Sequence, residues 1–215
     1  VSLLYAAEEP EHEIRPVKTA IGLDFSMSGL YVDSNGAHAD YPRFFRKSQE
    51  KLAREQRRLS HCEKGSNRYM KQKKKIARLH AHIARQRKDY LHKESRKITN
   101  FYDLVCIESL NMKEMSQDMC FGKRVHDNGW GMFTDFLAYK MERAGKKLVR
   151  IDRWYPSSKT CSCCGNIKED LQLSDRIYEC ACGNRMDRDQ NAAINICREG
   201  IRISGMILDT EKKIS

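Results

Sequence analysis

The sequence lacks any long apolar run. Its longest apolar stretches are only a few residues, far short of the roughly 20 that a helix needs to cross a bilayer. It also lacks an opening in which basic, apolar and small residues succeed one another, so nothing resembles an export signal. We therefore expect a cytoplasmic protein without a membrane partner. No internal repeat is visible, which disfavours a solenoid or other repeat architecture.

Proline is scarce, and none of the four prolines lies between Arg43 and Asn100. That stretch has helical periodicity, with Leu52, Gln56 and Leu59 on one expected face of a first helix. A second apolar stripe, at Ile76 and beyond, follows after a turn at 64–67. The pattern predicts two antiparallel helices with narrow apolar seams and basic outer faces.

Acidic residues are nearly absent from the same stretch. From Arg43 to Lys97 the sequence has 20 basic and 5 acidic residues, a net charge of +15, whereas the whole chain carries +11 and the remainder therefore −4. Such a block is either a solvated helical face or a surface for a polyanion, and we favour nucleic acid. The densest part, which we expect to contact phosphates without reading sequence, comprises Arg68, Lys71, Lys73, Lys74, Lys75 and Arg78.

Disulfides are not expected from the nine cysteines, because the chain has no export signal and the cysteines cluster late. Cys161 and Cys164 form a C-x-x-C pair, and Cys180 and Cys182 form a C-x-C pair, each followed by glycine. Four thiolates in two tight turns suit tetrahedral zinc and leave no open position, which indicates a structural ion. The second pair is one residue shorter than in a common zinc ribbon, so Cys163 stays open as a substitute ligand. The other reading is a set of ordinary free thiols.

The remaining pattern alternates between strands and helices, and 215 residues with 40% hydrophobic side chains allow one sizeable core plus insertions. We expect strands at 19–25, 29–32, 104–108 and 148–151, and helices at 132–143 and 189–197. Residues 112–130 and the Cys-rich 157–183 have loop-like or irregular sequences. This order predicts an α/β layered fold with two insertions. Trp130, Trp154 and Tyr155 could stack bases, but we favour packing in a core or interface.

Three acids stand at notable places in this pattern. Asp24 lies within an apolar strand, Glu108 ends another, and Asp189 opens a helix. A carboxylate beside a buried strand is costly unless something compensates it, and Mg²⁺ binds several carboxylates together. Two such ions can activate a water and stabilise the leaving oxygen of a phosphodiester. Taken singly, each acid could be a surface residue, and Asp187 or Asp189 could be a helix cap.

Three segments resemble the RuvC motifs of the OrfB/TnpB family of insertion-sequence proteins, which are related to compact type V CRISPR effectors. The segments are Ile21–Asp24, Val105–Asn111 and Asp187–Ile196. Further segments occur in the family's order, over about residues 18–199: Arg58–Ser60, Gly65–Asn67, Gln86–His92, Leu137–Lys140 and Ser157–Cys161.

The resemblance implies an RNase H-like (RuvC) α/β fold with a mixed sheet, an inserted basic helical hairpin and an inserted zinc ribbon. It implies that Asp24, Glu108 and Asp189 are the catalytic acids and hold Mg²⁺, and it favours Asp189 over Asp187. It also implies DNA and a guide RNA as partners. The boundaries expected from it are a linker or remnant at 1–17, a nuclease core at 18–153 with the basic insertion at 43–100, a zinc ribbon that binds target nucleic acid at 154–186, the last nuclease motif at 187–199, and a tail at 200–215.

Only about 17 residues precede the first motif, whereas the family has a long N-terminal portion there. We therefore expect a truncated or decayed nuclease half whose autonomous RNA-guided cutting is in doubt. Two other functions stay open from the sequence: a zinc-ribbon DNA-binding regulator of transposition without cleavage, and a guide-independent resolvase of the RuvC type.

Overall fold

The structure is a computed structural model that describes residues 17–112, 129–172 and 174–205. The expected loop at 112–130, the linker at 1–17 and the end of the tail lie largely outside these residues. The elements are β1 Ala20–Phe25, β2 Tyr31–Asp33, α1 Phe44–Ser60, α2 Asn67–Phe101, β3 Leu104–Glu108, α5 Trp130–Arg143, β4 Lys147–Ile151, β5 Ile177–Glu179, β6 Arg185–Asp187 and α6 Arg188–Ser204.

A mixed four-stranded sheet of order β2-β1-β3-β4 forms the centre of the molecule. β1 pairs antiparallel with β2 and parallel with β3, and β3 pairs parallel with β4. The turn that follows β2 is fixed by Asp33, whose Oδ1 accepts hydrogen bonds from the backbone N–H groups of Asn35 and Ala37 at 2.9 Å. The expected mixed α/β architecture is confirmed.

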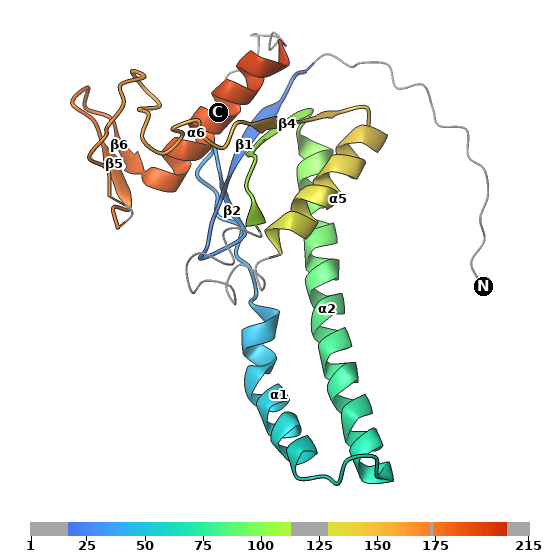
Figure 1. Ribbon diagram of the computed structural model, residues 1–215. Helices are drawn as coiled ribbons and strands as arrows, with labels where there is room; N and C mark the ends of the chain where they lie inside the picture. The colour runs from blue at the N-terminus through green and yellow to red at the C-terminus, as the bar shows by residue number, and fades with distance from the viewer. Residues whose placement is uncertain (1–16, 113–128, 173, 206–215) are drawn as a thin grey trace.

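Helices cover both faces of this sheet (Figure 1). Ile21, Leu23, Val105 and Ile107 point to the face that packs against α2 and α5, while alternate residues such as Cys106 face α6. β1 and α6 approach closely because residue 22 is glycine: a Cβ there would lie 2.0 Å from the carbonyl oxygen of Ala193. The sheet thus brings α6 directly over the strands that carry the expected acids.

The basic insertion is a helical hairpin, α1 and α2, that projects away from the sheet (Figure 1). Ser66 begins α2 as its N-cap and accepts a hydrogen bond from Tyr69 N–H at 3.1 Å. The expected seam is partly wrong: Leu52 is buried, but Gln56 is exposed and Glu55 is buried instead. Glu55 can enter the seam because cations and an amide of the hairpin meet its carboxylate there.

Two C-terminal expectations need correction. The helix expected at 189–197 is longer than expected, because α6 runs from Arg188 to Ser204. The reason is packing: Gly200 is buried where a Cβ would lie 2.3 Å from Cys106 Sγ, and Ile201 packs on the same core. In the Cys-rich segment, β5 and β6 form an antiparallel hairpin where an irregular segment was expected.

Candidate active site and metal site

Asp24 and Glu108 lie side by side at the carboxyl ends of adjacent parallel strands. The register pairs Leu23 with Ile107, so Asp24 and Glu108 are the next pair along. Both alternate with residues that face α2 and α5, and therefore point to the α6 face. The pKa of Asp24 is raised well above its ordinary value, first by desolvation and then by the negative charges of Glu108 and Asp189. The structure thus brings the three sequence-predicted acids within electrostatic reach of one another.

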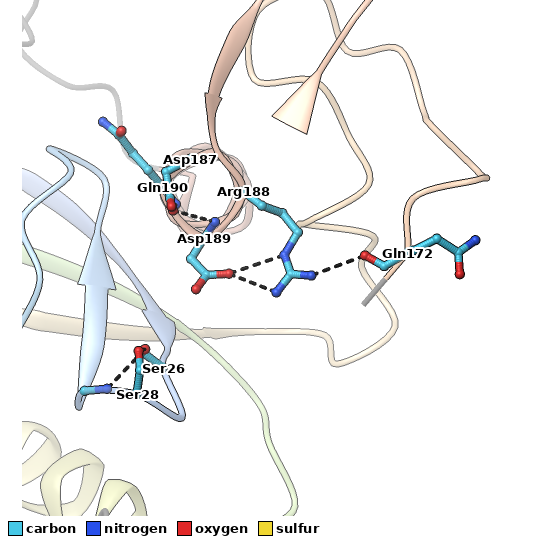
Figure 2. Close-up of polar contacts among 8 residues, drawn as sticks. Ser26, Ser28, Gln172, Asp187, Arg188, Asp189 and Gln190 are labelled. Carbon is cyan, nitrogen blue, oxygen red and sulfur yellow. Dashed lines mark hydrogen bonds and ion pairs between the residues drawn. The ribbon is translucent and has the colours of Figure 1, made fainter. Parts of the chain in front are cut away.

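The start of α6 distinguishes Asp187 from Asp189. Asp187 is the N-cap, and its Oδ1 accepts hydrogen bonds from the N–H groups of Asp189 at 2.9 Å and Gln190 at 3.0 Å. Asp189, whose side chain is 24% exposed, does not cap the helix. Figure 2 shows its carboxylate facing the guanidinium of Arg188 instead, with Nη2 3.2 Å from Asp189 Oδ1. The capping alternative therefore applies to Asp187.

Arg188 is a functional candidate that the sequence analysis did not single out. Its Nη1 donates to the carbonyl oxygen of Gln172 at 3.4 Å while Nε and Nη2 contact Asp189 (Figure 2). Its positive charge also lowers the pKa of Asp24 against the larger raising effects. A single arginine thus offsets part of the repulsion among the carboxylates.

Ser157 holds the carboxylate of Glu108 in place. Its side chain is buried, and its Oγ donates a hydrogen bond to Glu108 Oε1. Desolvation raises the pKa of Glu108, and this hydrogen bond partly counteracts the rise. The sequence analysis noted the motif that begins at Ser157 but assigned this residue no role, because only the fold brings it to Glu108.

Two buried asparagines connect α6 to the segment that follows β4. Asn191 Nδ2 donates to the carbonyl oxygen of Thr160 at 2.7 Å, and its Oδ1 accepts from Ser162 N–H at 2.9 Å. Asn195 Nδ2 donates to the carbonyl oxygens of Ser157 at 2.8 Å and Thr160 at 2.6 Å. Sequence reasoning missed both roles, although two asparagines spaced by four residues in a small-residue helix were a usable signal.

The four expected zinc ligands converge. The Sγ atoms of Cys161, Cys164, Cys180 and Cys182 all lie within 4.8 Å of one another. Cys161–Cys182 and Cys164–Cys180 are separated by 3.7 and 3.6 Å, close to the ~3.8 Å edge of a tetrahedron with zinc–sulfur bonds of about 2.3 Å. Cys163 is exposed and outside this group, so the shorter second pair does not require it.

The two cysteine turns are shaped by glycine and by hydrogen bonds. Gly165 and Gly183 have φ of 77° and 90°, the left-handed region that other residues rarely adopt. Cys161 Sγ accepts from Asn184 Nδ2 and from the N–H of Cys163, each at 3.4 Å. Burial raises the pKa of the Cys161 thiol, but such hydrogen bonds outweigh it and lower the pKa to about 6. A thiolate is thus favoured at the position a metal would need.

The expected phosphate-binding cations lie on exposed parts of α2. Lys71, Lys73 and Lys74 are exposed, as are Arg68 and Arg78. Lys75 is half exposed and has a second role, because its Nζ lies 3.0 Å from Glu55 Oε2. The structure adds a surface that sequence reasoning missed, an open groove of about 850 Å³ along α1 lined by Arg46, Gln49, Glu50, Ala53, Arg54, Arg57, Arg58 and His61.

Comparison with known proteins decides the family. Residues 2–119 match the model of a family described as probable transposase, OrfB of the IS605 type, over more than half of the chain. The chain belongs to this family. Residues 130–196 of this OrfB/TnpB-family chain also match a Cas12f1-like TNB domain.

Curated relatives are named as nucleases. The chain is 37% identical over 185 residues to a putative RNA-guided DNA endonuclease of Streptomyces pristinaespiralis, covering 86% of this chain and 46% of the relative. It is 32% identical over 203 residues to the putative RNA-guided DNA endonuclease InsQ of Escherichia coli (strain K12), covering 87% and 50%. This OrfB/TnpB-family chain therefore spans about half the length of these relatives.

Solved structures share the fold. A cryo-EM structure of a Cas12f1–sgRNA–target DNA complex matches with a TM-score of 0.59 at 19% identity, over 90% of this chain and 51% of that one. A CRISPR–Cas12f ternary complex matches with a TM-score of 0.61 at 18% identity, over 89% and 40%. The fold is thus a mixed α/β fold similar to that of Cas12f1. In the part of the chain that the structure describes, no helix is long and apolar enough to cross a membrane.

Proposed function

We propose that this chain carries the nuclease centre of a DNA endonuclease of transposon origin, with an RNase H-like (RuvC) fold and a three-carboxylate site. The observation that carries the proposal is the convergence of Asp24, Glu108 and Asp189: burial first, and then the charges of Glu108 and Asp189, raise the pKa of Asp24. Such a cluster is costly without a cation. Oxygen ligands of this kind fit Mg²⁺, and endonuclease names recur among the relatives.

The three carboxylates would hold two Mg²⁺ ions. When bound, such ions supply an activated water and stabilise the leaving oxygen of a phosphodiester. The chain's own residues orient these ligands: Ser157 holds one Glu108 oxygen by its hydrogen bond, and Asp187 fixes the first turn of α6. Arg188 contacts Asp189 and would provide a positive charge near a phosphate bound at the carboxylates.

The zinc cluster supports this site as a structural element. Its four cysteines fit a tetrahedral ion, and Asn191 and Asn195 connect the first cysteine turn to the helix that begins beside Asp189. Zinc would therefore hold the segment containing Ser157 against α6. We also propose that this zinc ribbon contacts the target strand, in keeping with the nucleic-acid complexes among its structural neighbours.

The partners follow from charge and from the relatives. DNA would lie along the cations of the α1–α2 hairpin, which contact phosphates without reading sequence. A guide RNA is proposed as a second partner because the relatives are named RNA-guided and one solved neighbour is a complex of Cas12f1 with sgRNA and target DNA. The chain spans about half the length of those relatives, and we propose guided cleavage for it as part of the same function.

The decisive experiment compares two neighbouring acids. Asp189→Asn and Asp187→Asn each remove one negative charge at the start of α6, but asparagine still caps a helix well. With Mg²⁺ and single-stranded DNA, Asp187→Asn should retain nicking, whereas Asp189→Asn and Asp24→Ala should lose it by about 100-fold or more, as removal of key catalytic electrostatics does. Cleavage should disappear with EDTA.

The alternatives predict different results. A zinc-ribbon regulator without cleavage activity would bind DNA but show no Mg²⁺-dependent products in any variant. A guide-independent resolvase would cut branched DNA without co-purifying small RNA. Equal nicking by Asp189→Asn and wild type would show that these acids do not form the centre.

A further inference from the structure

Trp154 is exposed to solvent instead of being packed in the core. Its side chain is 77% exposed, although the sequence analysis favoured a packed role for it. The other tryptophan, Trp130, is 2% exposed in the core. A tryptophan normally buries its large apolar surface, so an indole presented to solvent is a candidate contact for something outside the chain.

The backbone holds the indole in place rather than leaving it on a loose loop. Trp154 N–H donates to Asp152 Oδ1 at 2.7 Å, and Tyr155 N–H donates to the Asp152 carbonyl at 3.2 Å. The Tyr155 ring packs against the core that includes Ile196. This turn therefore buries one aromatic ring and exposes its neighbour.

Arg153 adds a positive charge to the same surface. Its guanidinium carbon lies 4.6 Å from the centroid of the Trp154 ring, within the range of a cation–π contact. Most of the ring remains exposed even so. An aromatic face beside a cation suits a ligand with a flat π system and a nearby negative charge, which describes a nucleotide.

The position of Trp154 relates it to the carboxylates. It lies three positions after Ile151, which pairs with Glu108 in the sheet, and three positions before Ser157, whose Oγ donates to Glu108. Three residues of chain span at most about 10 Å. The Cα of Trp154 is thus held within that distance of both neighbours of Glu108, at the same edge of the sheet as the acids.

We propose that Trp154, together with Arg153, is a stacking platform for one base of the single-stranded DNA whose phosphate enters the carboxylate site. The stacked base would lie a few nucleotides from the scissile bond and would fix the register of the strand. Stacking of this kind tolerates any base, because each has a π face. The inference rests on the proposed function only for the identity of the strand.

The test is fluorescence and affinity with the full chain, in Ca²⁺ rather than Mg²⁺, using oligothymidine. Because Trp130 is buried, quenching on binding reports Trp154. Trp154→Ala should weaken binding roughly fivefold or more, while Trp154→Phe, which keeps a ring, should stay within about twofold. Phe101→Ala is the matched control: Phe101 is 68% exposed but ends α2 before β3, at the opposite edge of the sheet, and its loss should change nothing.

An abasic oligomer of equal phosphate number separates stacking from charge. Wild type and Trp154→Ala should bind it equally, without quenching. The proposal would be overturned if Trp154→Ala bound oligothymidine as tightly as wild type, if Trp154→Ala lost as much affinity for the abasic strand as for oligothymidine, or if the full chain did not bind at all. The first of these results would leave a protein partner as the occupant of this surface. This binding test does not depend on cleavage. If Trp154→Ala showed the stacking defect while Asp24→Ala nicked DNA like wild type in the separate cleavage experiment, the nuclease centre would be refuted but the platform would not.

Discussion

Asp24 shows how one residue can combine a structural cost with a functional use. Its carboxylate is desolvated and repelled by two others, so the ionised form is disfavoured in the folded chain. At neutral pH, well above the ordinary pKa of an aspartate, this ionisation opposes folding unless a cation compensates it. The positive charge of Arg188 offsets only part of that cost.

Replacing this carboxylate should therefore stabilise the metal-free protein. Asp24→Asn should raise the melting temperature without added Mg²⁺ by about 2–4 °C for every 1 kcal/mol of repulsion relieved, and should reduce the stabilisation that added Mg²⁺ gives to wild type. Differential scanning fluorimetry measures both. Asp170→Asn, at an exposed acid of the zinc ribbon, is the control and should match wild type. An unchanged response to Mg²⁺ in Asp24→Asn would argue against shared ions.

The Cys-rich segment is the element whose order we expect to depend on a bound ion, because the Sγ atoms of its four clustered cysteines lie within 4.8 Å of one another. Cys161→Ser should lower the zinc content from one ion per chain to nearly none, because four thiolates bind far more tightly than three with a hydroxyl. Cys163→Ser should keep the zinc, because Cys163 is exposed and outside the cluster. Atomic emission on purified protein gives the ratio. Zinc loss in both variants would show that the ligand set is wrong.

The helical hairpin depends on the carboxylate of Glu55, which is 2% exposed between the two helices. Its pKa is lowered to about 2, first by the hydrogen bond from Gln72 and then by Lys75. A depressed pKa means that stabilisation is present above the ordinary value of 4.5 and is lost as the pH falls from there towards 2.

Glu55→Gln should accordingly lower the melting temperature at pH 7, and its difference from wild type should shrink as the pH drops below 4.5. Glu50→Gln makes the same charge change at an exposed position of the same helix and should leave stability unchanged. Circular dichroism melts over this pH range measure both. A constant difference between Glu55→Gln and wild type at every pH would remove the ion pair as the cause.

At the scale of the whole molecule, the positively charged hairpin and the cluster of carboxylates lie in different parts of the fold. The basic hairpin projects from the sheet (Figure 1). Asp24 and Glu108 lie on strands that contact α6, and Asp189 lies in the first turn of α6. A polyanion can thus be held by the hairpin without placing the hairpin's cations among the clustered carboxylates. Binding of this kind releases counterions and weakens with salt.

Neutralising Lys71, Lys73 and Lys74 together to glutamine should reduce the slope of log affinity against log salt by about 2, since each single-strand phosphate contact contributes roughly 0.7. Lys75 is kept because it pairs with Glu55. The control is a triple replacement with the same loss of charge, Lys18→Gln, Arg143→Gln and Lys147→Gln. These residues lie where strands of the sheet begin, outside the hairpin. Fluorescence anisotropy across salt concentrations should show an unchanged slope for the control. Equal slopes for both triples would mean that the hairpin lysines do not contact phosphate.

The sequence by itself determined the kinds of element and their order, because hydrophobic period and charge are local properties. The two helices of the hairpin, the strands that carry Asp24 and Glu108, and the cysteine pairs were all readable in this way. Composition also located the positive charge. The local pattern wrongly predicted Gln56 rather than Glu55 in the seam between the helices, and it predicted too early an end for α6. In each case a partner distant in sequence decides which residue is buried.

Only the tertiary structure decided which side chains meet. The register between β1 and β3 places Asp24 beside Glu108, and the cap made by Asp187 leaves Asp189 for the site. The role of Ser157 and the exposure of Trp154 likewise follow from chain segments brought together over long sequence distances. The physical reason is that contacts between remote residues depend on strand register and helix packing, which no local window of sequence contains.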